Sequence, residues 1–178
     1  MEKQQHDIQR IKTALQSGHA SCMIGAGFSF NAKPKTKGAK PFPSWRQLTS
    51  AIAERLYPKN EGARNDAVQS AGSSSGALRL AEEFESAFGR TELNRLLEEL
   101  IPDKLHEPSE VHTSLLELPW VDVYTTNYDT LLDRASTRIF QRSYMVIGQT
   151  QELPGSRRPR IIKPVSYTHL TLPTKRIV

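Results

Sequence analysis

Two short stretches place glycines and polar side chains directly after apolar runs. In the first, MIGAGFSF, the apolar run ends at Gly25, Ala26 and Gly27, and Ser29 follows. Glycine has no Cβ, so such a turn lets the backbone approach a ligand closely. Convergent backbone N–H groups in a turn suit phosphate oxygens, and the Ser29 hydroxyl can add a donor. The alternative is a tight turn between strand and helix that binds nothing.

This turn differs from two familiar phosphate-binding patterns. Phe30 stands where GxGxxG requires its third glycine, and no GK[ST] follows as in a P-loop. The turn taken alone therefore leaves the nucleotide site and the structural turn equally open.

The second stretch, VDVYTTNYDTLLDRA, reads as a strand, a turn and a helix. Asn127 in its turn is both a donor and an acceptor, and can hold a ribose hydroxyl or orient a water. Asp129 can accept hydrogen bonds or cap the following helix. The alternative for both residues is the turn and capping chemistry common to Asn and Asp, which we favour for Asp129 taken alone.

The surrounding pattern predicts the elements that must position these residues. Helices are expected over 7–17, from Trp45 with Ser44 as N-cap, over two segments within 77–100, and over 109–118. The segment NEGARNDAVQSAGSSSG has almost no apolar residues and predicts a mobile loop. Short strands are expected in ASCMIG, VDVYTTN, SYMVIG and RIIK. Strands separated by helices predict an α/β fold with a Rossmann-like parallel sheet, and 44–118 a helical insertion that forms a layer or lid.

Composition excludes several classes of protein. With 178 residues the chain is long enough for one domain with a real core. Its single cysteine, Cys22, permits neither an internal disulfide nor a Cys-rich zinc module, and reads as a small buried hydrophobe rather than a nucleophile. No apolar run approaches the roughly 20 residues of a membrane span, and the first residues lack a signal peptide's apolar region. We therefore expect a cytoplasmic protein.

The charge distribution does not support nucleic-acid binding. The net charge is +5, and the basic residues gather in KPKTKGAK and SRRPR, which read as polar loops. Neither stretch interleaves aromatic residues in the manner of a nucleic-acid platform.

Taken together, GAGFS, FPSWRQL and TTNYDTLLD occur in an order that resembles the sirtuin-like NAD-binding domain. The nearer resemblance is to the bacterial NAD-consuming branch found in phage-defence systems, and it covers about 21–163. By this resemblance Gly25, Ala26, Gly27 and Ser29 match the phosphate-binding turn.

Three further positions are carried over in the same way. Arg46 closes PSWR, which occupies the place of the family's PDFR segment, with Ser for Asp and Trp for Phe. Asn127 and Asp129 match the Asn and Asp of TQNID, while Thr126 and Tyr128 replace its Gln and Ile. The resemblance implies catalytic roles for Asn127 and Asp129, and NAD-binding roles for Arg46 and Thr126.

The implied activity is hydrolysis of the bond between nicotinamide and ribose, with NAD as substrate. The deacylases of the family carry a zinc ribbon with two Cys pairs, which this chain cannot build, so deacylation is the weaker interpretation. A non-catalytic module that senses NAD or an ADP-ribose derivative is the main alternative. The family also implies a fused sensor domain, a role in antiviral defence and a homo-oligomeric parent protein.

The family places a histidine in a segment resembling IIKLHG. This chain matches through Lys163 and then diverges, with Val165 at the expected histidine. Residues 165–174, VSYTHLTLPT, can be back-translated into a transposon-end adapter used in sequencing libraries. We therefore expect 164–178 to be a non-native tail and 1–163 the N-terminal part of the domain, with weak or no activity. The alternative is a natural hairpin, and sequencing the source DNA across codon 163 distinguishes the two.

Overall fold

The computed structural model describes residues 2–148 and 150–163. These residues form two compact units. The sheet unit comprises the residues up to Ala39 and those from Asp103 on, and the helical unit spans Lys40–Pro102. The expected insertion, 44–118, therefore extends further along the chain than the helical unit, and the helix predicted over 109–118 belongs to the sheet unit. The expectations for 164–178, a non-native tail or a natural hairpin, concern residues outside the described ranges.

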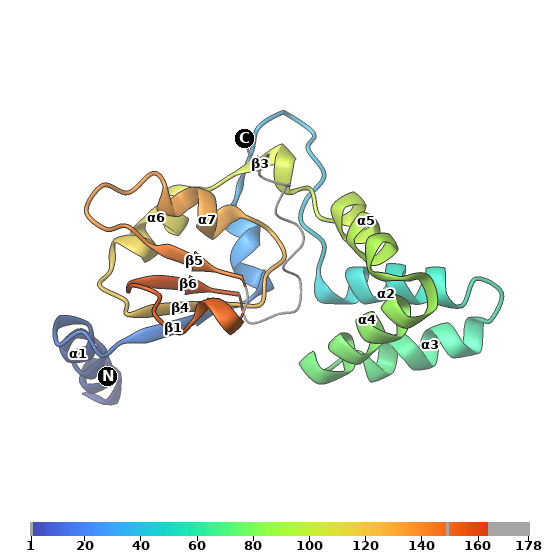
Figure 1. The fold of residues 1–178 in the computed structure, drawn as a ribbon, viewed down its shortest axis with the longest axis horizontal. Helices are drawn as coiled ribbons and strands as arrows, with labels where there is room; N and C mark the ends of the chain where they lie inside the picture. Colours follow the sequence, from blue (N-terminus) through green and yellow to red (C-terminus); the bar gives the residue numbers. More distant parts are fainter. Residues whose placement is uncertain (1, 149, 164–178) are drawn as a thin grey trace. The chain divides into compact units, whose positions relative to one another are not determined.

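The sheet unit is built on a four-stranded parallel sheet (Figure 1). Its strand order is β1 (Ser21–Ile24), β4 (Asp122–Thr125), β6 (Arg160–Ile162) and β5 (Met145–Ile147). All neighbouring strands are parallel, which confirms the predicted Rossmann-like α/β fold. Because the strands are parallel, the segments that leave β1, β4 and β6 emerge at one edge of the sheet.

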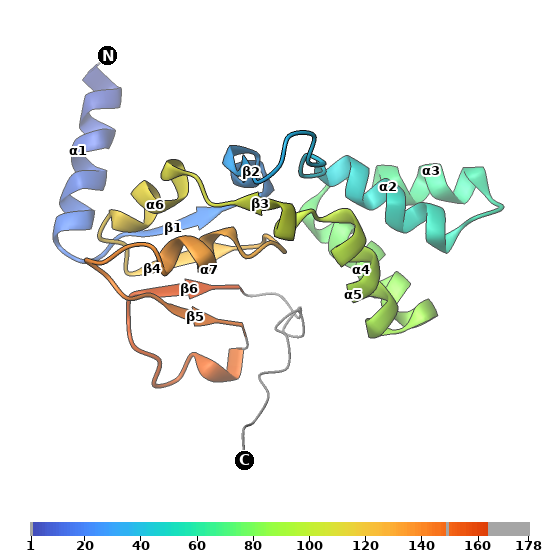
Figure 2. The same cartoon turned by 90° about the horizontal axis from the view of Figure 1, so that it is seen from above.

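Two helices cover one face of this sheet, α6 (Glu110–Glu117) and α7 (Leu131–Ser136), as Figures 1 and 2 show. Alternate residues of the strands point toward them, as the two-residue period of a strand requires. On the opposite face Met23 and Tyr124 remain exposed. The buried core beneath the two helices is formed by Ile24, Leu116, Val123, Leu132, Ala135, Ile139, Tyr144 and Ile161.

The rest of the sheet unit consists of short elements and one long helix. Helix α1 (Glu2–Gln16) begins earlier than the sequence predicted. A 3₁₀ helix, η1 (Ala26–Asn31), follows β1, and two more, η2 (Asp103–Leu105) and η3 (Thr150–Glu152), occur later. Strands β2 (Lys33–Pro34) and β3 (His106–Glu107) form an antiparallel pair that the sequence did not indicate. This pair joins the segment that leaves the sheet unit to the segment that returns to it.

The helical unit contains α2 (Trp45–Leu56), α3 (Glu61–Ser70), α4 (Ser74–Phe88) and α5 (Arg90–Leu100). Helix α2 contacts α3 and α4, and α4 contacts α5. The predicted N-cap of α2 is confirmed, because the Gln47 N–H donates to Ser44 Oγ at 3.3 Å.

The predicted loop at NEGARNDAVQSAGSSSG is wrong for most of its length, because it contains α3. This helix buries none of its side chains, so it lacks the apolar period by which helices are recognised. Its signal is the cap instead: Asn60 Oδ1 accepts a hydrogen bond from the Ala63 N–H at 3.0 Å. Among the described helices none is long and apolar enough to cross a membrane.

Candidate functional site

The two sequence motifs meet where β1 and β4 end. Ile24 and Thr125 are neighbours in the strand register, so the turns that follow them start side by side. The Asn127 side-chain Nδ2 donates to the Gly25 carbonyl oxygen and to Ser29 Oγ, each at 3.1 Å. A carbonyl can only accept, so this contact fixes which end of the Asn127 amide is the nitrogen. The structure thus brings Gly25, Ser29 and Asn127 together.

Ser29 is used within the protein rather than as a ligand donor. It is 4% exposed, and its hydroxyl donates to Asp129 Oδ2 at 2.6 Å. A hydroxyl has one proton, so Ser29 has none left for a phosphate oxygen in this arrangement. In this arrangement Ser29 bridges the two turns, and its expected role in binding phosphate stays a prediction.

Asp129 anchors the start of α7. Its Oδ1 accepts the Leu131 N–H at 3.1 Å, and the residue is 7% exposed. Burial raises the pKa of the carboxyl group, while the hydrogen bonds from Ser29 and Leu131 oppose that shift. This is the capping role that the sequence favoured for Asp129 taken alone.

The side-chain carbonyl oxygen of Asn127, Oδ1, has an unusual environment. It is buried, and no described residue gives it a hydrogen bond. A buried acceptor without a donor costs free energy, so this oxygen is suited to a donor from outside the protein. The Asn127 N–H donates to Thr125 Oγ1 at 3.1 Å, which holds the backbone of this turn in place.

The glycines of the first turn are not required by the fold. Gly25 has a φ of −104°, and Gly27 is also absent from the glycines with positive φ. No heavy atom lies within 4 Å of the position that a Cβ would take at either glycine. Open space therefore borders the backbone of this turn, with Ala26 between the two glycines.

Lys163 directly follows β6, and it is hydrogen-bonded to the turn that follows β4. Its Nζ donates to the Asp129 carbonyl oxygen at 2.9 Å and to Asp133 Oδ2 at 2.8 Å. The sequence placed Lys163 at the end of a strand that approaches the site, but a lone lysine gave no signal of this contact.

Asp103 lies in the segment that returns to the sheet unit, and it is hydrogen-bonded to the end of the same turn. Its carboxylate accepts from the Thr130 N–H at 3.1 Å, from Thr130 Oγ1 at 2.6 Å and from Arg134 at 2.7 Å. Thr130 directly follows Asp129, so this cluster fixes the point where the turn becomes α7. Nothing in the local sequence around Asp103 indicated this role.

His112 packs against η1. It is fully buried, and its ring meets the ring of Phe28 edge-on at a centroid distance of 4.8 Å. The Ser109 N–H donates to His112 Nδ1 at 3.2 Å, so Nδ1 is the unprotonated nitrogen. Burial lowers the pKa of His112, and the charge of Arg134 lowers it further. A neutral imidazole therefore supports Phe28, close in sequence to the glycine turn.

Three other residues that the sequence singled out remain to be placed: Thr126, Arg46 and Cys22. Thr126 is half-buried, and Arg46 is exposed in the first turn of α2 in the helical unit. Their predicted roles in NAD binding stay predictions. Cys22 is half-buried against the core, and burial raises its pKa to about 11, so it is not a thiolate near neutral pH.

Within residues 2–148 and 150–163, no group of three or more His, Cys, Asp or Glu side chains is arranged to hold a metal ion. The comparison with protein-family models gave no match, and the comparison with curated proteins gave none either.

Proposed function

We propose that the sheet unit binds NAD at the carboxyl ends of β1 and β4, as part of a sirtuin-like NAD hydrolase. One observation carries the proposal. Neither backbone conformation nor packing requires the two glycines of a turn whose Gly25 carbonyl oxygen accepts a hydrogen bond from Asn127 Nδ2, and the side-chain oxygen Oδ1 of the same Asn127 is buried without a donor from the described residues. Ligands of open α/β sheets bind at this edge, and glycines there admit a diphosphate close to the backbone.

The roles of the residues follow from their positions. The backbone around Gly25 and Gly27 would bind the diphosphate, and Asn127 Oδ1 would accept a hydrogen bond from a ribose hydroxyl or from water. Ser29 and Asp129 would position Asn127, because Asn127 donates to Ser29 and Ser29 donates to Asp129.

In the proposed hydrolysis, the bond between ribose C1′ and the nicotinamide nitrogen breaks, and its electron pair leaves with nicotinamide. The water oxygen bonds to C1′, and a water proton passes to a general base, a group that this chemistry requires in addition to Asn127. Holding the ribose and one water in line contributes by orientation.

A second candidate is a module that binds NAD or an ADP-ribose derivative without turnover. It is favoured by the internal use of Ser29 and Asp129, whose polar atoms are engaged with each other and with the start of α7. The other features implied by the resemblance are proposals that rest on it alone: antiviral defence, a fused sensor domain, a homo-oligomeric parent and a cytoplasmic location.

Calorimetry with NAD and an assay of nicotinamide release test both candidates. We expect the chain to bind NAD, and Asn127→Ala to weaken binding about tenfold, since one hydrogen bond within the site is lost. The matched control is Asn65→Ala, because Asn65 is exposed on α3 in the helical unit.

Three results separate the possibilities. Nicotinamide release by the wild type that Asn127→Ala abolishes at saturating NAD supports the hydrolase. Binding of NAD without nicotinamide release by the full-length parent protein supports the sensing module. A wild type that does not bind NAD, or an Asn127→Ala variant that binds it equally well, overturns the proposal.

A further inference from the structure

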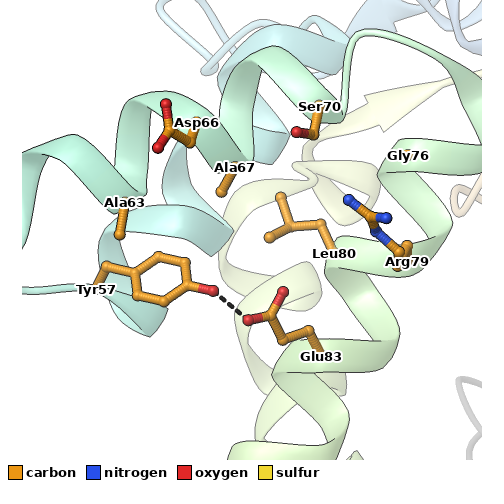
Figure 3. A pocket seen from close by; sticks show the side chains of 9 residues that line it. All are labelled: Tyr57, Ala63, Asp66, Ala67, Ser70, Gly76, Arg79, Leu80 and Glu83. Carbon is orange, nitrogen blue, oxygen red and sulfur yellow. Dashed lines mark hydrogen bonds between the residues drawn. The ribbon is translucent and has the colours of Figure 1, made fainter.

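The helical unit contains a pocket of its own, of about 280 Å³ (Figure 3). It is lined by α3, by α4 and by Tyr57 at the end of α2. A Cβ on Gly76 would lie 1.9 Å from the Ser70 carbonyl oxygen, so the close approach of α4 to the end of α3 requires glycine there. Small side chains, Ala63 and Ala67, leave the wall formed by α3 open.

Three charged side chains line this pocket, Asp66 on α3 and Arg79 and Glu83 on α4, and the two on α4 are not paired as their spacing would suggest. Arg79 and Glu83 are four residues apart on α4, a spacing at which opposite charges usually meet. Glu83 instead accepts a hydrogen bond from the Tyr57 hydroxyl, which contributes to a raised pKa for Tyr57. Arg79 has no hydrogen bond or ion pair with any described residue. Figure 3 shows Tyr57 and Glu83 together at one end, and Arg79 and Ser70 toward the other.

We infer that this pocket binds a small molecule with an acidic group at one end and an amine at the other. The acid would be bound by the Arg79 guanidinium and the Ser70 hydroxyl, and the amine by the Glu83 carboxylate. Between the two ends the pocket is lined by Leu80 and Ala67, which suits a short aliphatic chain. Four residues of helix rise about 6 Å, so the ligand charges are separated by several bonds.

The inference is independent of NAD binding, because every residue that lines the pocket belongs to the helical unit. It is tested by NMR titration of the full chain with 5-aminopentanoate, which carries both charges. Pentanoate, which lacks the amine, and pentylamine, which lacks the acid, are the matched ligands. We expect 5-aminopentanoate to shift the amide signals of α3 and α4 and to bind about tenfold more tightly than either.

Two variants assign the ends of the ligand. Arg79→Gln should bring the affinity for 5-aminopentanoate down to that for pentylamine, and Glu83→Gln should bring it down to that for pentanoate. Arg64→Gln is the control, since Arg64 is on α3 but does not line the pocket. Absence of binding at 10 mM 5-aminopentanoate, equal binding of pentanoate, or an unchanged affinity in Arg79→Gln overturns the inference. Because the ligand series uses the unaltered chain, it remains decisive if a variant fails to fold.

Discussion

At the scale of single residues, the site combines groups that the protein uses itself with groups that it leaves open. Ser29 and Asp129 are buried and bonded to each other, so they serve to position Asn127. Open space borders the Cβ positions of Gly25 and Gly27, and the side-chain oxygen Oδ1 of Asn127 has no hydrogen-bond partner among the described residues. Recognition of a ligand would therefore depend on the second group, and stability on the first.

Replacement of Gly27 by valine should separate these two properties. The new side chain meets no protein atom at its Cβ, and Gly27 has an ordinary φ, so folding should be unaffected. It would occupy the space that a diphosphate needs, so NAD binding should be lost. Gly62→Val, in α3, is the control. Retained NAD affinity in Gly27→Val would show that this turn does not bind the diphosphate.

The burial of Asp129 predicts a particular dependence of stability on pH. Its pKa is raised in the folded protein, so the folded state holds a proton that the unfolded state releases above about pH 4. The stability that Asp129 contributes is therefore complete below about pH 4 and falls as pH rises through the raised pKa. In urea unfolding, the wild type should lose stability relative to Asp129→Asn over this range. A constant difference between them would contradict the assignment.

At the scale of elements, the sequence predicted the helices and strands whose apolar residues recur with a clear period, and missed the elements that lack such a period. All four strands of the parallel sheet were predicted, because β-branched and apolar runs mark them. Helix α3 was missed because its residues are small and polar, and the β2–β3 pair because two residues per strand form no pattern. Asn127 and Gly25 were recognised by type, whereas Lys163 and Asp103 matter through contacts that only the fold creates.

The first positions of β4 and β6 are joined by a buried ion pair. Asp122 and Arg160 are neighbours in the strand register, and Arg160 donates to both carboxylate oxygens, at 2.6 and 2.9 Å. Arg160→Met should destabilise the protein by about 3–5 kcal/mol, since it leaves a buried carboxylate short of its main partner. Arg158→Met should cost less than about 1 kcal/mol, because Arg158 is largely exposed and 3.4 Å away. Chemical unfolding of both variants measures the difference, and equal losses would contradict it.

The start of α7 depends on the returning segment. Asp103→Ala removes the acceptor for Thr130 and the partner of Arg134, and should cost about 1.5–3 kcal/mol. Glu107, in the same returning segment as Asp103, forms an exposed ion pair with Arg138. Glu107→Ala should therefore lower the free energy of unfolding by less than about 1 kcal/mol. Denaturant unfolding monitored by circular dichroism distinguishes them. A loss in Asp103→Ala no greater than in Glu107→Ala would show that Asp103 does not hold this turn.

At the scale of the whole molecule, the chain separates into a sheet unit and a helical unit. The sequence predicted a helical insertion over 44–118, which includes α6, whereas the helical unit spans Lys40–Pro102 and does not include it. The reason is physical: α6 has the same amphipathic pattern as the helices before it, and only its packing on the sheet assigns it to the sheet unit. A helical period shows that a face is buried, but does not show which partner buries it.

The central claim is that NAD binds at the carboxyl ends of β1 and β4. The most direct test is an NMR titration of the ¹⁵N-labelled chain with NAD, with the signals of both units assigned. The account predicts that the backbone amides of Gly25 and Gly27 and the side-chain amide of Asn127 shift together and saturate at one affinity. If these signals stay unchanged at millimolar NAD, or if the shifts occur only in the helical unit, the claim is contradicted.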